Sequence, residues 1–364
     1  LNNNKGVGFN NANVNVKVDL NATDAHRFSV LFSRGSHNQS SAIRGNPVPL
    51  PLPFVVTRVV DEVPTVGQVK HTWVMNATMV NQVSLGASRL WIPITNPTID
   101  GKWVEKAGIK GLPKGDATES FPEVSFAGPN SPQGWRGTDA RPFLDALNNF
   151  TFQDNFQWVR GSHAVKAGFQ LQRLQDNYRA RWDETLFIGA FSNAQTAGFT
   201  AGRLNSATGN SYASYLLGTL NSSTVNEDSV VTSGARFRNY AWWIGDDWKI
   251  THNLTLNLGL RYDLMYPYVE VRDRVSWFNP DIPNAAAGNY PGALQFGGPG
   301  QSPLYCDCRT RIKTQYNNWG PRIGFAYKLG DRTVVRAGYG MMYTRHGAVG
   351  GRGGARDGTG KLGY

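Results

Sequence analysis

A run of alternating side chains at residues 254–268 constrains the fold more than any other feature. Every even-numbered residue in it is leucine or tyrosine, whereas the odd positions include Asn257, Arg261 and Asp263. Side chains of a β-strand point alternately to opposite faces, so one face of this strand would be apolar and the other polar. The run has fifteen residues, while strands in globular proteins usually have about 5–6. We therefore predict an unusually long strand.

The segment before this run alternates in the same way, and residues 251–253 join the two as a tight turn. Two alternating runs on either side of a short polar turn are typical of a β-hairpin. Four further hairpins are predicted around short turns near residues 23–25, 76–81, 160–162 and 330–332. The sequence thus predicts about ten long strands, arranged as five hairpins.

Long connections separate the hairpins and hold most of the proline, at about 35–67, 93–147, 179–235 and 271–316. Bacterial outer-membrane barrels combine short periplasmic turns with long extracellular loops. A sandwich or propeller is not expected to place every short turn on one side and every long loop on the other. We predict an all-β fold, a partial antiparallel transmembrane β-barrel over residues 1–346, followed by a glycine-rich flexible tail at 347–364.

The composition agrees with a sheet in lipid. Charged residues make up 17% of the chain and aromatic residues 12%, whereas soluble domains contain about 25% charged residues. The net charge of +11 is compatible with a nucleic-acid partner. The lysines and arginines are nevertheless scattered singly, without a basic run, so we expect no nucleic-acid binding.

Signatures of catalysis are absent from the sequence. We find no Gly-x-Ser-x-Gly elbow, no His-Glu-x-x-His motif and no Walker loop, so we predict neither an enzyme nor a cofactor. Cys306 and Cys308 form a Cys-Asp-Cys triplet. A metal or redox site is one interpretation, but no further ligands have suitable spacing, which favours a local disulfide or two free thiols.

Residues 240–262 carry a resemblance to a known family. Asp246-Asp-Trp-Lys249 followed by Leu254-Thr-Leu-Asn-Leu-Gly-Leu-Arg-Tyr262 closely resembles a barrel hairpin of TonB-dependent outer-membrane receptors. Segments 163–171 and 318–340 resemble other hairpins of these receptors. Segments 108–113 and 209–218 look like the Oar-like subgroup.

This resemblance implies a transporter in the outer membrane of a Gram-negative-type bacterium. Such a barrel moves a large solute, here unidentified, and receives energy through a plug domain and TonB. Members of the family carry a signal peptide, a TonB box and a plug before a barrel of about 22 strands, and none of these segments is visible here. We therefore expect an interior piece of a longer barrel, which by itself would form an open, curved sheet or aggregate. Its expected partners are outer-membrane lipid, the plug, TonB and the solute.

Two other functions remain open at this stage. A passive porin or a surface-adhesion barrel would have the same strands without a TonB box upstream. A soluble carbohydrate-binding β-protein would use the many aromatic residues as a stacking platform for sugars.

Charged residues on the polar phase are candidates for the lumen wall, namely Lys166, Arg261, Asp263, Arg322 and Arg336. A basic wall would attract anionic solutes or contact a plug. A polar barrel interior, however, needs hydrated charged side chains whatever passes through it. We favour this second interpretation for most of the five.

Aromatic residues near strand ends are candidates for an interfacial girdle, because amphipathic rings favour the headgroup level of a membrane. They are Trp242, Trp248, Tyr262, Tyr266, Tyr268, Tyr339 and Tyr343. Two acidic residues, Asp154 and Asp246, fall on the apolar phase instead. Asp246 lies close to its turn, whereas Asp154 either faces lipid or follows a β-bulge that shifts the phase.

Overall fold

The computed structural model describes residues 8–42, 54, 57–95, 101–111, 121–135, 143–179, 188–224 and 232–344. The predicted flexible tail, residues 347–364, lies outside these ranges. None of the helices in the described ranges is both long and apolar enough to cross a membrane.

Ten long strands form one antiparallel sheet, in which each strand pairs with the next along the path. A further strand of two residues, β14 (Val269–Glu270), pairs with β12. The ten strands are β1 (Gly8–Asn21), β2 (His26–Ala42), β3 (Thr57–Asn76), β4 (Met79–Thr95), β6 (Phe143–Arg160), β7 (His163–Arg179), β12 (Thr232–Lys249), β13 (Leu254–Met265), β17 (Trp319–Leu329) and β18 (Thr333–Gly340). The predicted ten strands and five hairpins are confirmed.

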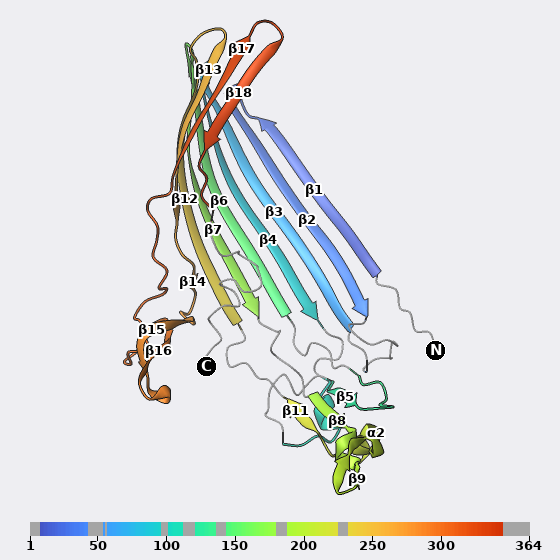
Figure 1. Cartoon of the computed structure of the whole chain (residues 1–364). Helices are drawn as coiled ribbons and strands as arrows, with labels where there is room; N and C mark the ends of the chain where they lie inside the picture. The colour runs from blue at the N-terminus through green and yellow to red at the C-terminus, as the bar shows by residue number, and fades with distance from the viewer. Residues whose placement is uncertain are drawn as a thin grey trace.

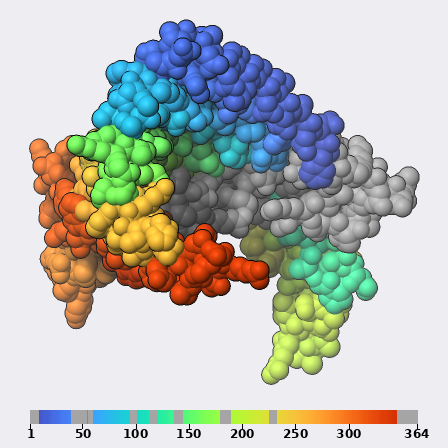
Figure 2. Space-filling model, turned by 90° about the horizontal axis from the view of Figure 1, so that it is seen from above, coloured from blue at the N-terminus to red at the C-terminus, as the bar shows by residue number. Residues whose placement is uncertain are grey.

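The sheet is open and strongly curved. Within the described residues its two edges are β1 and β18, which do not pair with each other. The short turns gather at one end of the strands, and the long connections gather at the other (Figure 1). Seen along the strands, the sheet curves from β1, in blue, round to β18, in red, and these two edge strands lie on opposite sides of the view (Figure 2). This is the open, curved sheet expected for a partial barrel.

Strand register keeps the apolar phases on one face across the whole sheet. Trp242 in β12 lies opposite Phe169 in β7 and Tyr262 in β13. Phe152 in β6 lies opposite Leu85 in β4 and continues the same face. Because directly paired residues share a face, the alternation predicted in single strands becomes one convex apolar surface and one concave polar surface.

The first long connection is shorter than the predicted range of 35–67. β2 continues to Ala42 and β3 begins at Thr57, so strand pairing extends well into this range. Polar residues such as Ser36 and Asn38 interrupt the alternation here. Backbone pairing does not require apolar side chains, so these strands continue where the period-two signal has ended.

Two small substructures lie at the long-loop end (Figure 1). In the first, β5 (Glu123–Ala127), β8 (Ile188–Ser192) and β11 (Ser222–Thr224) form a sheet, in which β5 and β8 are parallel. Near it lie α2 (Ser211–Leu216) and the pair β9 (Gly198–Thr200) and β10 (Arg203–Asn205). In the second, β15 (Ser276–Asn284) pairs with β16 (Tyr290–Phe296). The short helix α1 (Trp103–Lys106) lies in the connection after β4.

Cys306 and Cys308 form a disulfide bond in the connection that follows the β15–β16 hairpin. The backbone N–H of Cys306 donates to the carbonyl of Phe296 at 3.0 Å, which fixes the triplet to the end of β16. The disulfide and this hydrogen bond therefore stabilise the loop that follows β16. Among the described residues, no group of three or more His, Cys, Asp or Glu side chains is arranged to hold a metal ion.

Candidate functional site on the inner wall

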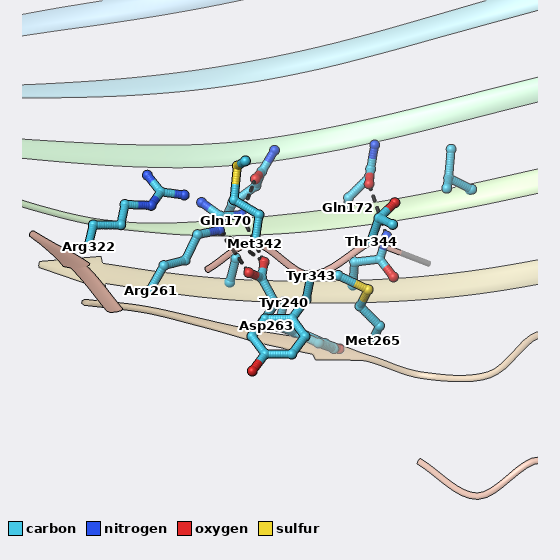
Figure 3. Close-up of a pocket in the computed structure, with 13 residues that line it drawn as sticks. Gln170, Gln172, Tyr240, Arg261, Asp263, Met265, Arg322, Met342, Tyr343 and Thr344 are labelled. Carbon is cyan, nitrogen blue, oxygen red and sulfur yellow. Dashed lines mark hydrogen bonds and ion pairs between the residues drawn. The ribbon is translucent and has the colours of Figure 1, made fainter. Parts of the chain in front are cut away.

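A recess of about 440 Å³ lies on the concave face, where β7, β12, β13 and β17 run side by side. Its polar lining comes from Gln170, Gln172, Asn239, Arg261, Asp263 and Arg322. Residues 342–344, just beyond β18, complete it (Figure 3). The recess therefore combines amide groups with two arginines and one carboxylate.

Arg261 is the best-held residue of this site. Its Nε donates to both carboxylate oxygens of Asp263 at 3.0 Å, and its Nη2 donates to Gln170 Oε1 at 3.4 Å. The guanidinium also lies over the ring of Trp243, 5.2 Å from its centroid. Charge-assisted pairs and stacking on an aromatic ring both suit the planar guanidinium. These three contacts fix the direction of Arg261 across the wall.

Glycines make room for the large side chains of the site. Trp243 lies over Gly168 of β7, where a Cβ would stand 2.3 Å from Trp243 Cζ2. Gly320 lies opposite Arg261, and Gly259 lies opposite Arg322. Each arginine thus faces a position without a side chain, and long side chains can extend along the wall.

The five predicted lumen residues all lie on the polar phase, but they do not form one site. Arg261 and Arg322 are diagonal neighbours on β13 and β17 and line the same recess. Figure 3 shows their side chains rising from the two strands toward the same side. Arg336 lies opposite Ala326, four residues along β17 from Arg322, and does not line the recess.

The predicted lumen cations also differ in whether a carboxylate neutralises their charge. Lys166 Nζ pairs with Asp247 Oδ2 at 2.7 Å, and Asn257 donates to the other oxygen of Asp247 at 2.6 Å. Arg261 is likewise balanced by Asp263, whose side chain is 11% exposed. Arg322 is exposed and has no ion pair within the described part of the chain. It is therefore the cation of the recess that is available to a solute.

The predicted girdle residues occupy different levels of the sheet. Trp248 stacks on His163 with 5.2 Å between the ring centroids, one residue before β12 ends at a short turn. Trp242 contacts Tyr262 at 5.9 Å on the same outer face. Six residues of a tilted strand span about 14 Å along the membrane normal. Trp248 thus lies at the short-turn end of the sheet, whereas Trp242 and Tyr262 lie further along the strands, and the girdle itself stays a prediction.

The four other predicted girdle residues lie beyond or near the ends of their strands. Tyr266 follows β13 and receives the guanidinium of Arg238 over its ring at 5.4 Å, and Tyr268 contacts Phe237 at 5.9 Å. Tyr343 was expected on the last strand, but β18 ends at Gly340 and Tyr343 lines the inner recess. This position differs from the one predicted on the last strand, and the place of Tyr343 in a girdle stays a prediction. Tyr339, on the edge strand β18, is 66% exposed.

The two acidic residues on the apolar phase have different surroundings. The pairing of β6 with β4 and with β7 continues without a shift past Asp154, which lies opposite Val83 and Phe169. Asp154 therefore faces outward and no bulge removes it, and its Oδ1 is buried without a hydrogen-bond partner. Asp246, near the short turn, pairs with His163 Nδ1 at 2.6 Å.

Sequence reasoning missed two features of the site, the glutamines of the recess and the tryptophan beside Arg261. Gln170 and Gln172 were available from the alternation, because they fall on the polar phase of residues 163–171 and its continuation. Trp243 was not singled out from the sequence, and it lies on the odd, inward phase of β12 opposite Gly168. The strand phase predicted that Trp243 points inward, whereas its large aromatic side chain suggested an outward position.

Comparisons with known proteins agree with this architecture. The sequence matches the family described as outer membrane beta barrel domain over residues 1–357. No curated protein matches the sequence.

The chain is similar to several solved structures at low sequence identity and with TM-scores below 0.5. The ferric-catecholate import receptor Fiu of E. coli K12, in its open form, is 14% identical, with a TM-score of 0.48 over 92% of this chain and 47% of that chain. The copper transporter OprC is 12% identical, with a TM-score of 0.46 over 92% of this chain and 37% of that chain. The siderophore receptor PiuA of Acinetobacter baumannii is 12% identical, with a TM-score of 0.38 over 89% of this chain and 41% of that chain. The chain spans less than half the length of each of these structures.

Proposed function

We propose a transport function on the premise that the chain belongs to the family of outer membrane β-barrel domains. Its place in the cell is the outer membrane. The proposed function is that of a barrel segment through which a TonB-dependent transporter moves a large solute. A plug domain and TonB would supply the coupling to energy, as the resemblance at residues 240–262 implies.

The observation that carries this proposal is the polar inner wall. Hydrated charged side chains are expected in any barrel interior, but Arg322 is in addition left without an ion pair among the described residues, beside the amide groups of a recess. Arg322 lies on the concave face, while the amides of Gln170, Gln172 and Asn239 offer hydrogen bonds. A wall of this kind suits a hydrated solute that carries negative charge or many hydroxyl groups.

Uptake by cells tests the transport function. The full-length protein that contains this barrel segment is produced in an outer-membrane host with and without a working TonB, and a panel of ferric siderophores, metal complexes and oligosaccharides is supplied. Accumulation of one of them only in the TonB-competent host is expected. Equal, concentration-driven entry in both hosts would indicate a passive porin, and no entry in either host would favour an adhesion barrel.

Two arginine variants connect the recess to transport. Arg322→Gln removes the free cation of the recess, whereas Arg336→Gln removes the same charge from the same wall outside it. We expect Arg322→Gln to raise the half-saturating concentration of an anionic solute several-fold more than Arg336→Gln. Equal effects would show that general wall charge, and not the recess, acts on the solute.

A further inference from the structure

Two arginines lie side by side on the outer, apolar face of the sheet. Arg173 of β7 and Arg238 of β12 are directly paired, and both are exposed. Both continue the outward phase, because Leu171 and Tyr240 precede them in register on the same face. Like charges directly opposite each other destabilise a sheet. The repulsion between Arg173 and Arg238 therefore has to be offset, either by a bound anion or by another stabilising interaction.

Acidic residues do not supply that anion. Within the described part of the chain, neither guanidinium has an ion pair. The guanidinium of Arg238 lies over the ring of Tyr266 in a cation–π contact. Asp176, the nearest carboxylate along β7, lies on the inward phase and is buried. The outward side of the pair is left open to the surroundings of the barrel.

The height of the pair coincides with the edge of the apolar band. Arg173 lies ten residues beyond His163, the first residue of β7, and Arg238 lies eleven residues before Lys249, the last residue of β12. Ten residues of a strand tilted by about 45° rise about 23 Å, and the apolar band of an outer-membrane barrel is about 25 Å tall. The guanidinium groups thus stand at the headgroup level on the long-loop side.

Two more outward arginines extend this level around the sheet. Arg34 of β2 and Arg89 of β4 both lie opposite Thr65 of β3, on the same face. Both are exposed, and the guanidinium of Arg89 lies over the ring of Trp91 at 4.6 Å. Basic side chains therefore recur on the outer face where the strands leave the apolar band.

An apolar groove leads away from the pair along the outer face. It has a volume of about 560 Å³ and reaches from Val30 and Phe32 on β2 to Leu171 and Arg173 on β7. Its floor includes Gly67, where no atom lies within 4 Å of the place a Cβ would take. The groove is the right kind of surface for a hydrocarbon chain, and it ends at a cation.

We propose that Arg173 and Arg238 together bind the phosphate of a phosphorylated lipid of the outer leaflet, with one acyl chain of that lipid in the groove over Gly67. Arginine forms bidentate hydrogen bonds with phosphate, and a phosphate between two guanidinium groups removes their mutual repulsion. A bound lipid also fills the surface left open by the small residue at Gly67.

Lipid that copurifies with the protein tests this proposal. The protein is extracted from its own outer membrane in mild detergent, and native mass spectrometry counts the bound lipids. It is also placed in phosphatidylcholine vesicles with and without added lipid A, the phosphorylated probe. We expect one phosphorylated lipid to be retained by the native protein and lipid A to bind at least about tenfold more tightly than phosphatidylcholine.

Three variants locate the site. Arg173→Gln with Arg238→Gln removes both guanidinium groups, and Gly67→Phe fills the groove without altering charge. Arg160→Gln, on the same face but at the short-turn end beside Trp158, is the matched control. Retention is expected to fall about tenfold in the double variant and several-fold in Gly67→Phe, and to stay unchanged in Arg160→Gln. Heat modifiability of each purified variant shows that its barrel is assembled.

Three outcomes would overturn the proposal. One is unchanged retention in the assembled double variant, and another is equal binding of phosphatidylcholine and lipid A. The third is full displacement of lipid A by inorganic phosphate, which would assign the pair to a soluble anion.

Discussion

Alternate residues of the β12–β13 hairpin form its outer and its inner face, and the two faces differ in how their charged side chains are placed and paired. On the inner face Arg261 pairs directly with Asp263, and Asp247 pairs with Lys166 of the neighbouring strand β7. On the outer face Arg238 lies toward the long-loop end and Asp246 toward the short turn, where each meets an aromatic ring or a histidine. Medium, and not residue type, decides where a charge is tolerated.

Asp154 is the exception that makes the comparison informative. It lies six residues from the end of β6 on the outer face, about 14 Å along the membrane normal, and so near the middle of the apolar band. Its Oδ1 has no hydrogen-bond partner within the described residues.

A single charge placed on either face should give the largest difference. Phe156→Arg puts a cation on the outer face near the middle of the band, whereas Asn155→Arg puts it on the adjacent inward position. We expect Phe156→Arg to lower the free energy of unfolding by about 2–4 kcal/mol and Asn155→Arg by less than about 1 kcal/mol. Denaturant unfolding of the protein in bilayers measures both, and equal losses would show that the two faces are not distinct media.

A methyl group on either face tests packing in place of charge. Gly168→Ala places a Cβ 2.3 Å from Trp243 Cζ2 and 2.5 Å from the carbonyl oxygen of Asp154, so something must move. We expect a loss of about 1–3 kcal/mol. Gly67→Ala is the control, because no atom lies within 4 Å there, and its stability should be nearly that of the native protein.

Tryptophan fluorescence of the same variants reports on the cause. If Gly168→Ala leaves both stability and the Trp243 environment unchanged, Trp243 does not lie over Gly168 as described.

Removal of a misplaced charge should give the smallest effect and the opposite sign. Asp154→Val matches the apolar neighbours Val83 and Phe169, and we expect a gain of about 1–2 kcal/mol in the free energy of unfolding. Asp247→Asn, on the inner face, removes the partner of Lys166 and should cost less than about 1 kcal/mol. A loss of stability in Asp154→Val would mean that Asp154 has a polar partner in the membrane.

Most of the strand frame was predictable because alternation is a local property. The phase of residues 254–268 gave the directions of Arg261 and Asp263 correctly, and short turns identified the hairpins. Strand ends were less accessible, as at Ala42 and Thr57, because outside the apolar band the outward residues need not be apolar. Absence of a bulge at Asp154 has no sequence signal, since both alternatives contain the same residues.

The loop substructures and the recess could not be predicted for a different reason. β5 and β8 pair in parallel although about sixty residues separate them, and pairings of such distant segments leave no local pattern. The recess depends on which residues of four strands come to one height, as Gln170 does beside Arg261. Register between strands, unlike phase within a strand, is set by the assembled sheet.

Site-directed spin labelling along β7 tests the two-faced wall most directly. Single labels at positions 164–172 of the protein in bilayers are exposed in turn to oxygen, which concentrates in lipid, and to a water-soluble nickel complex. We predict period-two accessibility, with oxygen reaching the labels at Val165, Ala167, Phe169 and Leu171 and nickel reaching those at Ala164, Lys166, Gln170 and Gln172. Uniform access of either reagent along the strand, or alternation in the opposite phase, would contradict a barrel wall with a lipid-facing and a water-facing side.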